Sequence, residues 1–166
     1  RHLKPIEIIE TLSRAVSVEM DLRLEAAAGD ELRSNFKDDP LFRIPEMDWT
    51  RTGKRVLTLQ RIEGIRIDDV AALEKTGHEP EVLVANMARS FFLQVFRDGF
   101  FHADLHPGKL LIAPDGVIQV VDFGIMGRID KRTRLYLAEM LIGFLTADYA
   151  RVLAAHFRAG YVSRDQ

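Results

Sequence analysis

The apolar positions in the first part of the chain recur at the spacing of an amphipathic helix. Between residues 6 and 36 they fall near the 3.6-residue period of a helix. These positions are Ile8, Ile9, Leu12, Val16, Met20 and Leu24. Gly29 is a candidate for a break or kink. Asp39-Pro40 is expected to end the helix, because the residue before a proline avoids the helical region.

An extended pattern follows between residues 41 and 67. Residues 42–45 form one candidate strand, and residues 55–60 alternate in the manner of a half-buried strand. Gly64 interrupts this pattern, and residues 65–67 are expected to be briefly extended. Asp68 and Asp69 are candidate caps of a short helix that reaches about Lys75.

A second strong helix is predicted from Pro80 to Asp98. Proline suits the first helical turn, and Gly99 suits the position just past the end. The apolar side chains form a wide stripe, which makes this helix a core element. The stripe comprises Leu83, Val84, Met87, Ala88, Phe91, Phe92 and Val95.

A short β-hairpin is predicted after a loop that begins at residue 100. Its strands are residues 110–113 and 117–121, and a Pro-Asp-Gly turn joins them. The remainder is expected to be helical, with Asp130 and Asp148 as N-terminal caps and Gly160 at the end of the last helix. No internal repeat or domain linker is visible.

Composition narrows the classes of protein. The 166 residues suit one compact domain or part of a larger one. A net charge of -2 and a pI near 6.2 give no electrostatic footprint for nucleic acid. The absence of cysteine excludes disulfides and thiolate zinc sites. No apolar stretch reaches the length of about 18 residues that a membrane span needs.

The most informative stretch of the chain contains His102 and Asp104 and is followed, eighteen residues after Asp104, by Asp122-Phe123-Gly124. Phosphoryl transfer needs one carboxylate to position a hydroxyl nucleophile, and oxygen ligands for Mg²⁺ on the transferred phosphate. One carboxylate precedes the predicted hairpin and the other follows it, so both should lie at the same edge of the fold. The protein-kinase signature has this layout.

The motifs resemble one family of atypical kinases in particular. Residues 101–108 read Phe-His-Ala-Asp-Leu-His-Pro-Gly, and residues 115–128 read Asp-Gly, five residues, then Asp-Phe-Gly-x-x-Gly-Arg. Both look like the UbiB family, which is linked to ubiquinone biosynthesis. Glu19-x-Asp21, the following Glu25, and the segments 43–46 and 57–64 also resemble its motifs, so the similarity covers nearly the whole chain.

The resemblance implies an α+β, mainly α fold. We expect a protein-kinase-like C-terminal lobe with the αC helix and a small β-hairpin at the active site. Residues 1–56 would be a remnant of the N-lobe, and residues 57–166 the C-lobe. Arg1 looks like a cut inside a longer chain, so the family's N-terminal extension, nucleotide loop and strand lysine are expected before it. On this view the fragment alone would be inactive.

The resemblance also implies residue roles. Asp104 would be the catalytic-loop aspartate, Asp122 the Mg²⁺ ligand, and Glu25 the αC glutamate that pairs with the strand lysine. His102 is grouped with these catalytic residues, although in kinase-like loops this histidine more often braces the backbone.

Five further residues are expected to contribute to binding the cofactor. Glu19 and Asp21 would form the family's Glu-x-Asp element. Gln60 and Ile62 would belong to the hinge. Lys109 would lie near the phosphates.

The implied cofactors are ATP and Mg²⁺. The longer protein would transfer phosphate or hydrolyse ATP in support of ubiquinone biosynthesis. Its substrate would be a lipid-like or small-molecule ubiquinone precursor or a protein, and its partners would include other proteins of that biosynthesis. It would be cytoplasmic and peripheral to or anchored in the inner membrane, through segments outside this chain.

Asp21 and Glu25 are four residues apart, and like charges at this spacing destabilise a helix by about 0.2–0.5 kcal/mol unless a cation intervenes. Arg23 lies well around the helix from both and is expected to be poorly placed to help. The hypothesis is that the cation is the strand lysine.

Two positions depart from the family pattern. Lys109 stands where the family has an asparagine, and an ammonium group has no acceptor with which to bind a metal. We therefore expect Lys109 to weaken or abolish the second metal site while the site at Asp122 survives. Gln60 replaces an acidic hinge residue, with little expected loss because hinge contacts commonly come from the backbone.

Other interpretations stay open. Asp104 and Asp122 are also residue types that cap turns. His102-x-Asp104-x-His106 has ligand types that suit a zinc hydrolase. Small-molecule kinases of the aminoglycoside or choline type carry a similar Asp-Leu-His-Pro-Gly loop. A non-catalytic pseudokinase would be consistent with Lys109.

Overall fold

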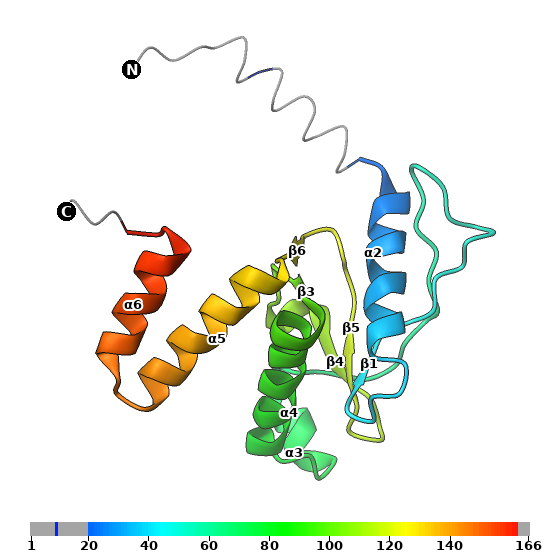
Figure 1. The fold of residues 1–166 in the computed structure, drawn as a ribbon. Helices are drawn as coiled ribbons and strands as arrows, with labels where there is room; N and C mark the ends of the chain where they lie inside the picture. The colour runs from blue at the N-terminus through cyan, green and yellow to red at the C-terminus, as the bar shows by residue number, and fades with distance from the viewer. Residues whose placement is uncertain (1–8, 10–19, 163–166) are drawn as a thin grey trace.

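The computed structural model describes residue 9 and residues 20–162. The expected helical positions Ile8, Leu12 and Val16 lie outside these residues. Figure 1 shows a main body, in which helices α2 and α4 lie on either side of short strands, and a helical hairpin of α5 and α6 that extends away from it. No helix in the described part is long and apolar enough to cross a membrane.

Helix α2 spans Leu22–Asn35 and begins at Asp21, which is its N-cap. The predicted continuous helix over 6–36 is therefore wrong at Asp21, where the backbone leaves the helical region at φ -102 and ψ 88. Gly29 does not break α2. A Cβ there would lie 2.4 Å from Met47 Cε and 2.8 Å from Phe123 Cδ2, so glycine lets α2 approach both side chains closely.

The main sheet has the order β1-β5-β4-β2. Its strands are β1 (Phe42–Arg43), β2 (Ile65–Arg66), β4 (Leu110–Ile112) and β5 (Ile118–Val120). Strand β1 pairs with β5 in parallel, and the other pairs are antiparallel. The predicted hairpin is thus confirmed as β4 and β5.

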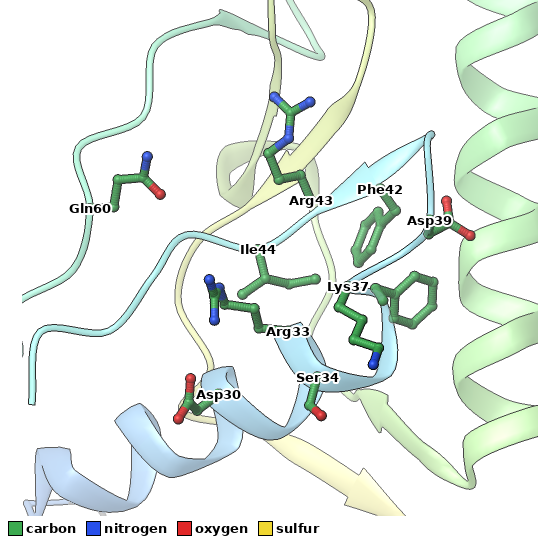
Figure 2. A pocket seen from close by; sticks show the side chains of 10 residues that line it. Asp30, Arg33, Ser34, Lys37, Asp39, Phe42, Arg43, Ile44 and Gln60 are labelled. Atoms are coloured by element: carbon green, nitrogen blue, oxygen red, sulfur yellow. The ribbon is translucent and has the colours of Figure 1, made fainter.

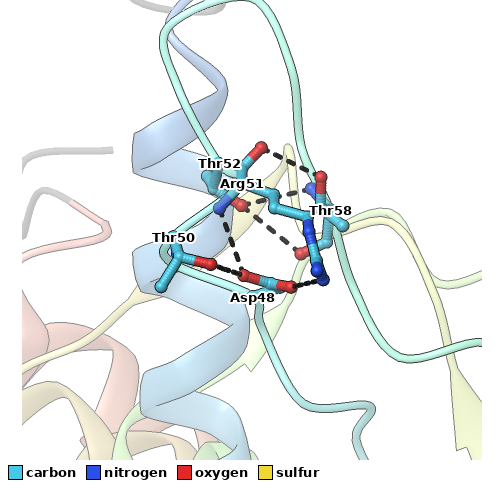
Figure 3. Close-up of polar contacts among 5 residues, drawn as sticks. All are labelled: Asp48, Thr50, Arg51, Thr52 and Thr58. Carbon is cyan, nitrogen blue, oxygen red and sulfur yellow. Dashed lines mark hydrogen bonds and ion pairs between the residues drawn. The ribbon is translucent and has the colours of Figure 1, made fainter.

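The predicted strand at residues 55–60 is wrong. Only isolated bridges, Gly53 with Val56 and Met47 with Leu59, occur in this region. Side chains occupy the backbone groups that a ladder would use: Thr58 N donates to Thr52 Oγ1 (3.1 Å), and Thr58 Oγ1 donates to the Arg51 carbonyl (3.0 Å). Figure 3 shows this network, in which Asp48 accepts hydrogen bonds from both Thr50 and Arg51. Side chains thus bond locally around Thr58, and backbone pairing is limited to the short stretch where Asp48 N–H donates to the Thr58 carbonyl and Gln60 N–H to the Glu46 carbonyl.

Helix α3 (Val70–Lys75) is capped by Asp69, as predicted. The following helix has two parts, because α4 (Pro80–Phe92) continues as a π-helix, η1 (Leu93–Asp98). Gly99 ends it in the left-handed conformation at φ 67. The predicted range is therefore confirmed, but its last turns are not α-helical.

A second sheet occupies a segment that was expected to be a loop. Strand β3 (Phe100–His102) pairs antiparallel with β6 (Met126–Arg128), and His102 is opposite Met126. A 3-10 turn, η2 (Pro107–Lys109), then leads into β4. This arrangement places the end of β3 and the exit from β5 at the same edge of the body.

The hydrophobic core lies between α2, α4 and the strands. Its buried members come from every part of the main body. They are Leu32, Phe36, Phe42, Ile44, Met47, Leu73, Leu83, Phe100, Leu110, Ile112, Ile118, Val120 and Phe123. The proposed lobe boundary at residues 56 and 57 stays a prediction.

Helices α5 (Lys131–Leu145) and α6 (Tyr149–Ala159) form the hairpin. Asp130 and Asp148 cap them, as predicted, and Gly160 ends α6 at φ 74. The two helices pack on a separate small cluster of Met140, Val152 and Ala155.

Candidate active site

Three charged side chains meet at the edge where β3 and β5 end. The Lys109 ammonium forms an ion pair with Asp104, and its Nζ lies 3.1 Å from Asp122 Oδ2. The lysine side chain is only 10% exposed, whereas the two carboxylates are about half exposed, at 47% and 48%. The predicted convergence of Asp104 and Asp122 is therefore confirmed, and Lys109 lies between them.

The lysine changes the electrostatics of both acids. Its hydrogen bond lowers the pKa of Asp104 below the ordinary value. For Asp122, burial raises the pKa, but the Gly124 N–H and Lys109 together outweigh it, and the net pKa is lowered. Burial alone would lower the pKa of Lys109, yet its bonds to the two acids raise it above the usual range. All three groups are therefore charged at neutral pH.

His102 braces the backbone on both sides of this cluster. Its ring is buried, and Nε2 lies 2.7 Å from the Asp122 carbonyl oxygen. The Asp104 N–H donates to Nδ1 at 3.2 Å. Because Nδ1 accepts, Nε2 holds the proton and donates it to the carbonyl. Burial lowers the pKa of His102, which keeps the ring neutral.

Asp122 has an uncommon backbone conformation for a residue with a side chain. Its φ is 69, in the left-handed region. Asp122 Oδ1 accepts a hydrogen bond from the Gly124 N–H at 3.1 Å. Aspartate tolerates this region because its short side chain can bond to nearby backbone. The turn leaves the other oxygen, Oδ2, directed toward Lys109.

Glu25 joins helix α2 to this loop. Its Oε1 accepts a hydrogen bond from the Phe123 N–H at 3.1 Å. A cavity of about 470 Å³ lies between α2 and the loop. It is lined by Asp21, Leu24, Glu25, Ala28, Phe123, Gly124, Ile125 and Met126. The structure therefore brings Glu25 to the Asp122–Gly124 turn.

The expectation about Arg23 is wrong. Its Nε and one terminal nitrogen donate to the two carboxylate oxygens of Asp21, at 2.8 and 2.6 Å. Asp21 is outside the helix as its N-cap, so the Arg23 side chain can fold back over it. This hydrogen bonding lowers the pKa of Asp21 to about 2. The assumed repulsion with Glu25 along a continuous helix therefore does not apply.

Gln60, one of the two residues expected at the hinge, lines a cavity that contains no member of the charged cluster. The cavity, of about 520 Å³, lies beside the end of α2 and β1, and Arg33, Arg43 and Ile44 also line it (Figure 2). Gln60 Oε1 accepts a long hydrogen bond, 3.4 Å, from the Glu46 N–H. Ile62 is half-buried, and Glu19 lies outside the described residues. The binding roles of Gln60, Ile62 and Glu19 stay predictions.

The donor set fits one nucleotide-bound Mg²⁺ at Asp122, since this ion takes one or two carboxylates and completes its shell with phosphate oxygens and water. A second ion has no acceptor at Lys109. The geometry disfavours the zinc interpretation, because both ring nitrogens of His102 are engaged and only Asp104 and His106 remain of its three ligands. Within the described residues, no three potential ligands gather to hold a metal.

Sequence reasoning missed one polar residue, Gln94. It is fully buried in η1, and its Oε1 accepts a hydrogen bond from the His102 N–H at 2.9 Å. The available signal was a glutamine beside the apolar stripe of a core helix.

Comparison with known proteins identifies the family. Residues 1–156 match the ABC1 atypical kinase-like domain. The chain belongs to this family. It is 42% identical over 166 residues to a probable protein kinase UbiB of Marinobacter nauticus, which covers 98% of this chain and 30% of that protein. The corresponding protein of Aliivibrio fischeri is 38% identical over 169 residues, covering 99% of this chain and 31% of that protein.

The UbiB resemblance is therefore confirmed, and the chain spans about a third of the length of these relatives. Among solved structures, the complex of Rv3197 with erythromycin from Mycobacterium tuberculosis matches with a TM-score of 0.75 at 23% identity. That match covers 96% of this chain and 40% of the other. It shows the kinase-like fold and confirms the predicted fold class.

Proposed function

We propose that this chain forms the phosphate-and-metal end of an ATP site in an atypical kinase or ATPase of the UbiB type. The observation that carries the proposal is the cluster of Asp104, Lys109 and Asp122 at one edge, braced by His102. Membership of an atypical kinase-like family supports it.

Each charged group has a distinct role in this proposal. Asp104, half exposed, orients the attacking hydroxyl or water and accepts its proton. Asp122 binds Mg²⁺, which supplies positive charge to the transferred phosphate. Lys109 holds a fixed ammonium between the two carboxylates and takes part of the electrostatic role of a second ion.

The names of the relatives and the family resemblance support a proposal for the wider biological role. Their name, probable protein kinase UbiB, favours phosphoryl transfer to a protein, and the family resemblance favours a lipid-like or small-molecule precursor in ubiquinone biosynthesis. ATP hydrolysis without transfer fits the same cluster. We propose association with the inner membrane and with other proteins of that biosynthesis on the resemblance alone.

Turnover should be measured in a chimera, in which this chain replaces the matching segment of the Marinobacter nauticus relative. We expect magnesium-dependent ATP turnover, and a loss of about 10²–10³-fold in kcat in Asp122→Asn. Asp68→Asn is the matched control, because Asp68 pairs with Arg66 on the surface. Turnover that survives Asp122→Asn would contradict the proposal. Binding of ATP without turnover would instead identify a pseudokinase.

The number of metal ions provides a separate test. Magnesium titration of the chimera with ATP present should follow a single binding phase, because Lys109 offers no lone pair to a second ion. Lys109→Asn restores an oxygen ligand and should add a second phase. Superimposable curves for the two proteins would exclude this role of Lys109.

A further inference from the structure

The junction between α4 and η1 places a polar side chain inside the core. A π-helix adds residues to its turn and so shifts which side chains face inward. Gln94 and Val95 are both buried here, although they are adjacent in sequence. Gln94 is 0% exposed, and a buried amide is unfavourable unless its polar atoms are bonded.

Gln94 has one hydrogen bond among the described residues. Its Oε1 accepts from the His102 N–H at 2.9 Å, while its Nε2 finds no partner in that part of the chain. An apolar side chain of similar size would fill the space without leaving a donor unsatisfied. The contact with His102 is therefore what the amide contributes.

The pairing of β3 with β6 explains why the His102 N–H needs an acceptor from a side chain. The next residue, Ala103, donates its N–H across to Ile125 on the β6 side, at 2.9 Å. Backbone groups alternate in direction along a strand, so the His102 N–H points away from β6. His102 is buried, and without Gln94 this donor would have no acceptor.

A connected set of hydrogen bonds runs from Gln94 to both acids. Gln94 holds the backbone of His102, whose ring in turn accepts from Asp104 N and donates to the Asp122 carbonyl. Any shift of His102 therefore moves the backbone of Asp104 and Asp122 together.

We propose that Gln94 is a positioning residue for phosphoryl transfer, which sets the imidazole of His102 and thereby the spacing of Asp104 and Asp122. The proposal rests on the function proposed above for that cluster. Gln94 touches neither nucleotide nor metal in this scheme. Its effect is transmitted through hydrogen bonds that fix the spacing of the two carboxylates.

The first experiment tests the connection without activity. In the chain itself, labelled with ¹⁵N-histidine, NMR should show a His102 backbone N–H that is protected from exchange with water, because Gln94 Oε1 is its acceptor. Gln94→Met keeps the size of the side chain and removes the acceptor. It should reduce that protection roughly five- to tenfold, the factor expected for one lost hydrogen bond. Where Gln94→Met does not fold, Gln94→Asn withdraws the acceptor with a shorter polar chain.

A matched control and a rescue variant accompany this measurement. Ser90 is also fully buried on α4, but its hydroxyl donates its hydrogen bond to the Asn86 carbonyl and not to His102. Ser90→Ala should therefore leave the protection unchanged. Gln94→Glu retains an acceptor, and burial should keep its carboxyl neutral, so protection should largely return.

The second experiment measures turnover in the chimera. Gln94→Met should lower kcat about tenfold with little change in KM for ATP, because positioning matters most in the transition state. Gln94→Glu should recover most of the loss. Protection and kcat equal to those of Ser90→Ala would overturn the proposal, and so would reduced protection with an unchanged kcat. A wild-type chimera with no turnover would contradict the proposed function, and the positioning role with it, even where the NMR contact is confirmed.

Discussion

The main body and the α5–α6 hairpin are held together in different ways. In the main body a large buried cluster underlies several polar side chains with a defined partner, such as Glu25 with the Phe123 N–H. The hairpin packs on three buried residues. It exposes several large apolar side chains, including Leu135, Phe144, Leu145, Tyr149 and Leu153. The difference indicates that precise geometry is concentrated around the charged cluster, where a small displacement would matter for chemistry.

The largest expected difference in the free energy of unfolding is between substitutions in the buried cluster of the main body and in that of the hairpin. Leu32 is fully buried in the main cluster, so Leu32→Ala should reduce the free energy of unfolding by about 2–5 kcal/mol. Val152→Ala in the hairpin removes fewer atoms from a smaller cluster and should cost about 1–2 kcal/mol. Denaturant unfolding measures both. Equal losses would show that the two regions are one cooperative core.

The second largest effect is expected at the contact between α2 and the Asp122–Gly124 turn. Glu25→Ala leaves the buried Phe123 N–H without its acceptor and should cost about 1–2 kcal/mol in the free energy of unfolding. Glu25→Gln keeps an acceptor and should lose less. Glu31→Ala on the same helix breaks only a surface ion pair with Arg128, so a loss below about 1 kcal/mol is expected. A Glu31 effect as large as that of Glu25 would contradict the special role of the loop contact.

A smaller effect, dependent on pH, is expected at Lys109. Lys109→Met should lower the thermal midpoint at neutral pH, because it leaves Asp104 and Asp122 without their cation. The folded protein holds the pKa values of both carboxyl groups below the unfolded value of about 3.9. The stabilisation by Lys109 is therefore fully present above about pH 3.9, and it is lost as the pH falls through the pKa values of the folded protein. Melting curves between pH 3 and 7 should therefore converge at the acidic end. A difference that stays constant with pH would exclude this electrostatic origin.

The smallest effect belongs to the exposed face of the hairpin. Leu145 is 77% exposed, so Leu145→Gln should change the free energy of unfolding by less than about 0.5 kcal/mol. A larger destabilisation in denaturant titration would mean that this face is packed in solution. The contrast drawn above between a closely packed main body and a hairpin with an exposed apolar face would then be wrong.

Features set by nearby residues were predictable from the sequence. Asp69, Asp130 and Asp148 cap helices because each lies within three residues of the backbone N–H that it accepts from. The Pro-Asp-Gly turn likewise specifies the β4–β5 hairpin locally. The kinase-like motif then placed Asp104 and Asp122 at one edge, and the structure confirms their approach.

Features that depend on distant partners were not predictable in this way. Strand β3 exists because β6 lies beside it, more than twenty residues later in the chain. Residues 55–60 alternate like a strand, but the Thr58 N–H and hydroxyl bond to Thr52 and Arg51, and only isolated bridges form. The role of Gln94 depends on a register shift in η1, which hydrophobic periodicity alone cannot reveal.

The left-handed backbone of Asp122 decides which variant can serve as an inactive reference. An ordinary residue in that conformation costs roughly 1–2 kcal/mol, which aspartate, asparagine and glycine largely avoid. An alanine at position 122 would remove the carboxylate and strain the chain at once, so its phenotype would mix lost chemistry with a distorted loop. Asparagine removes only the charge, since its amide oxygen can still accept from the Gly124 N–H. Glycine removes the whole side chain without straining the backbone.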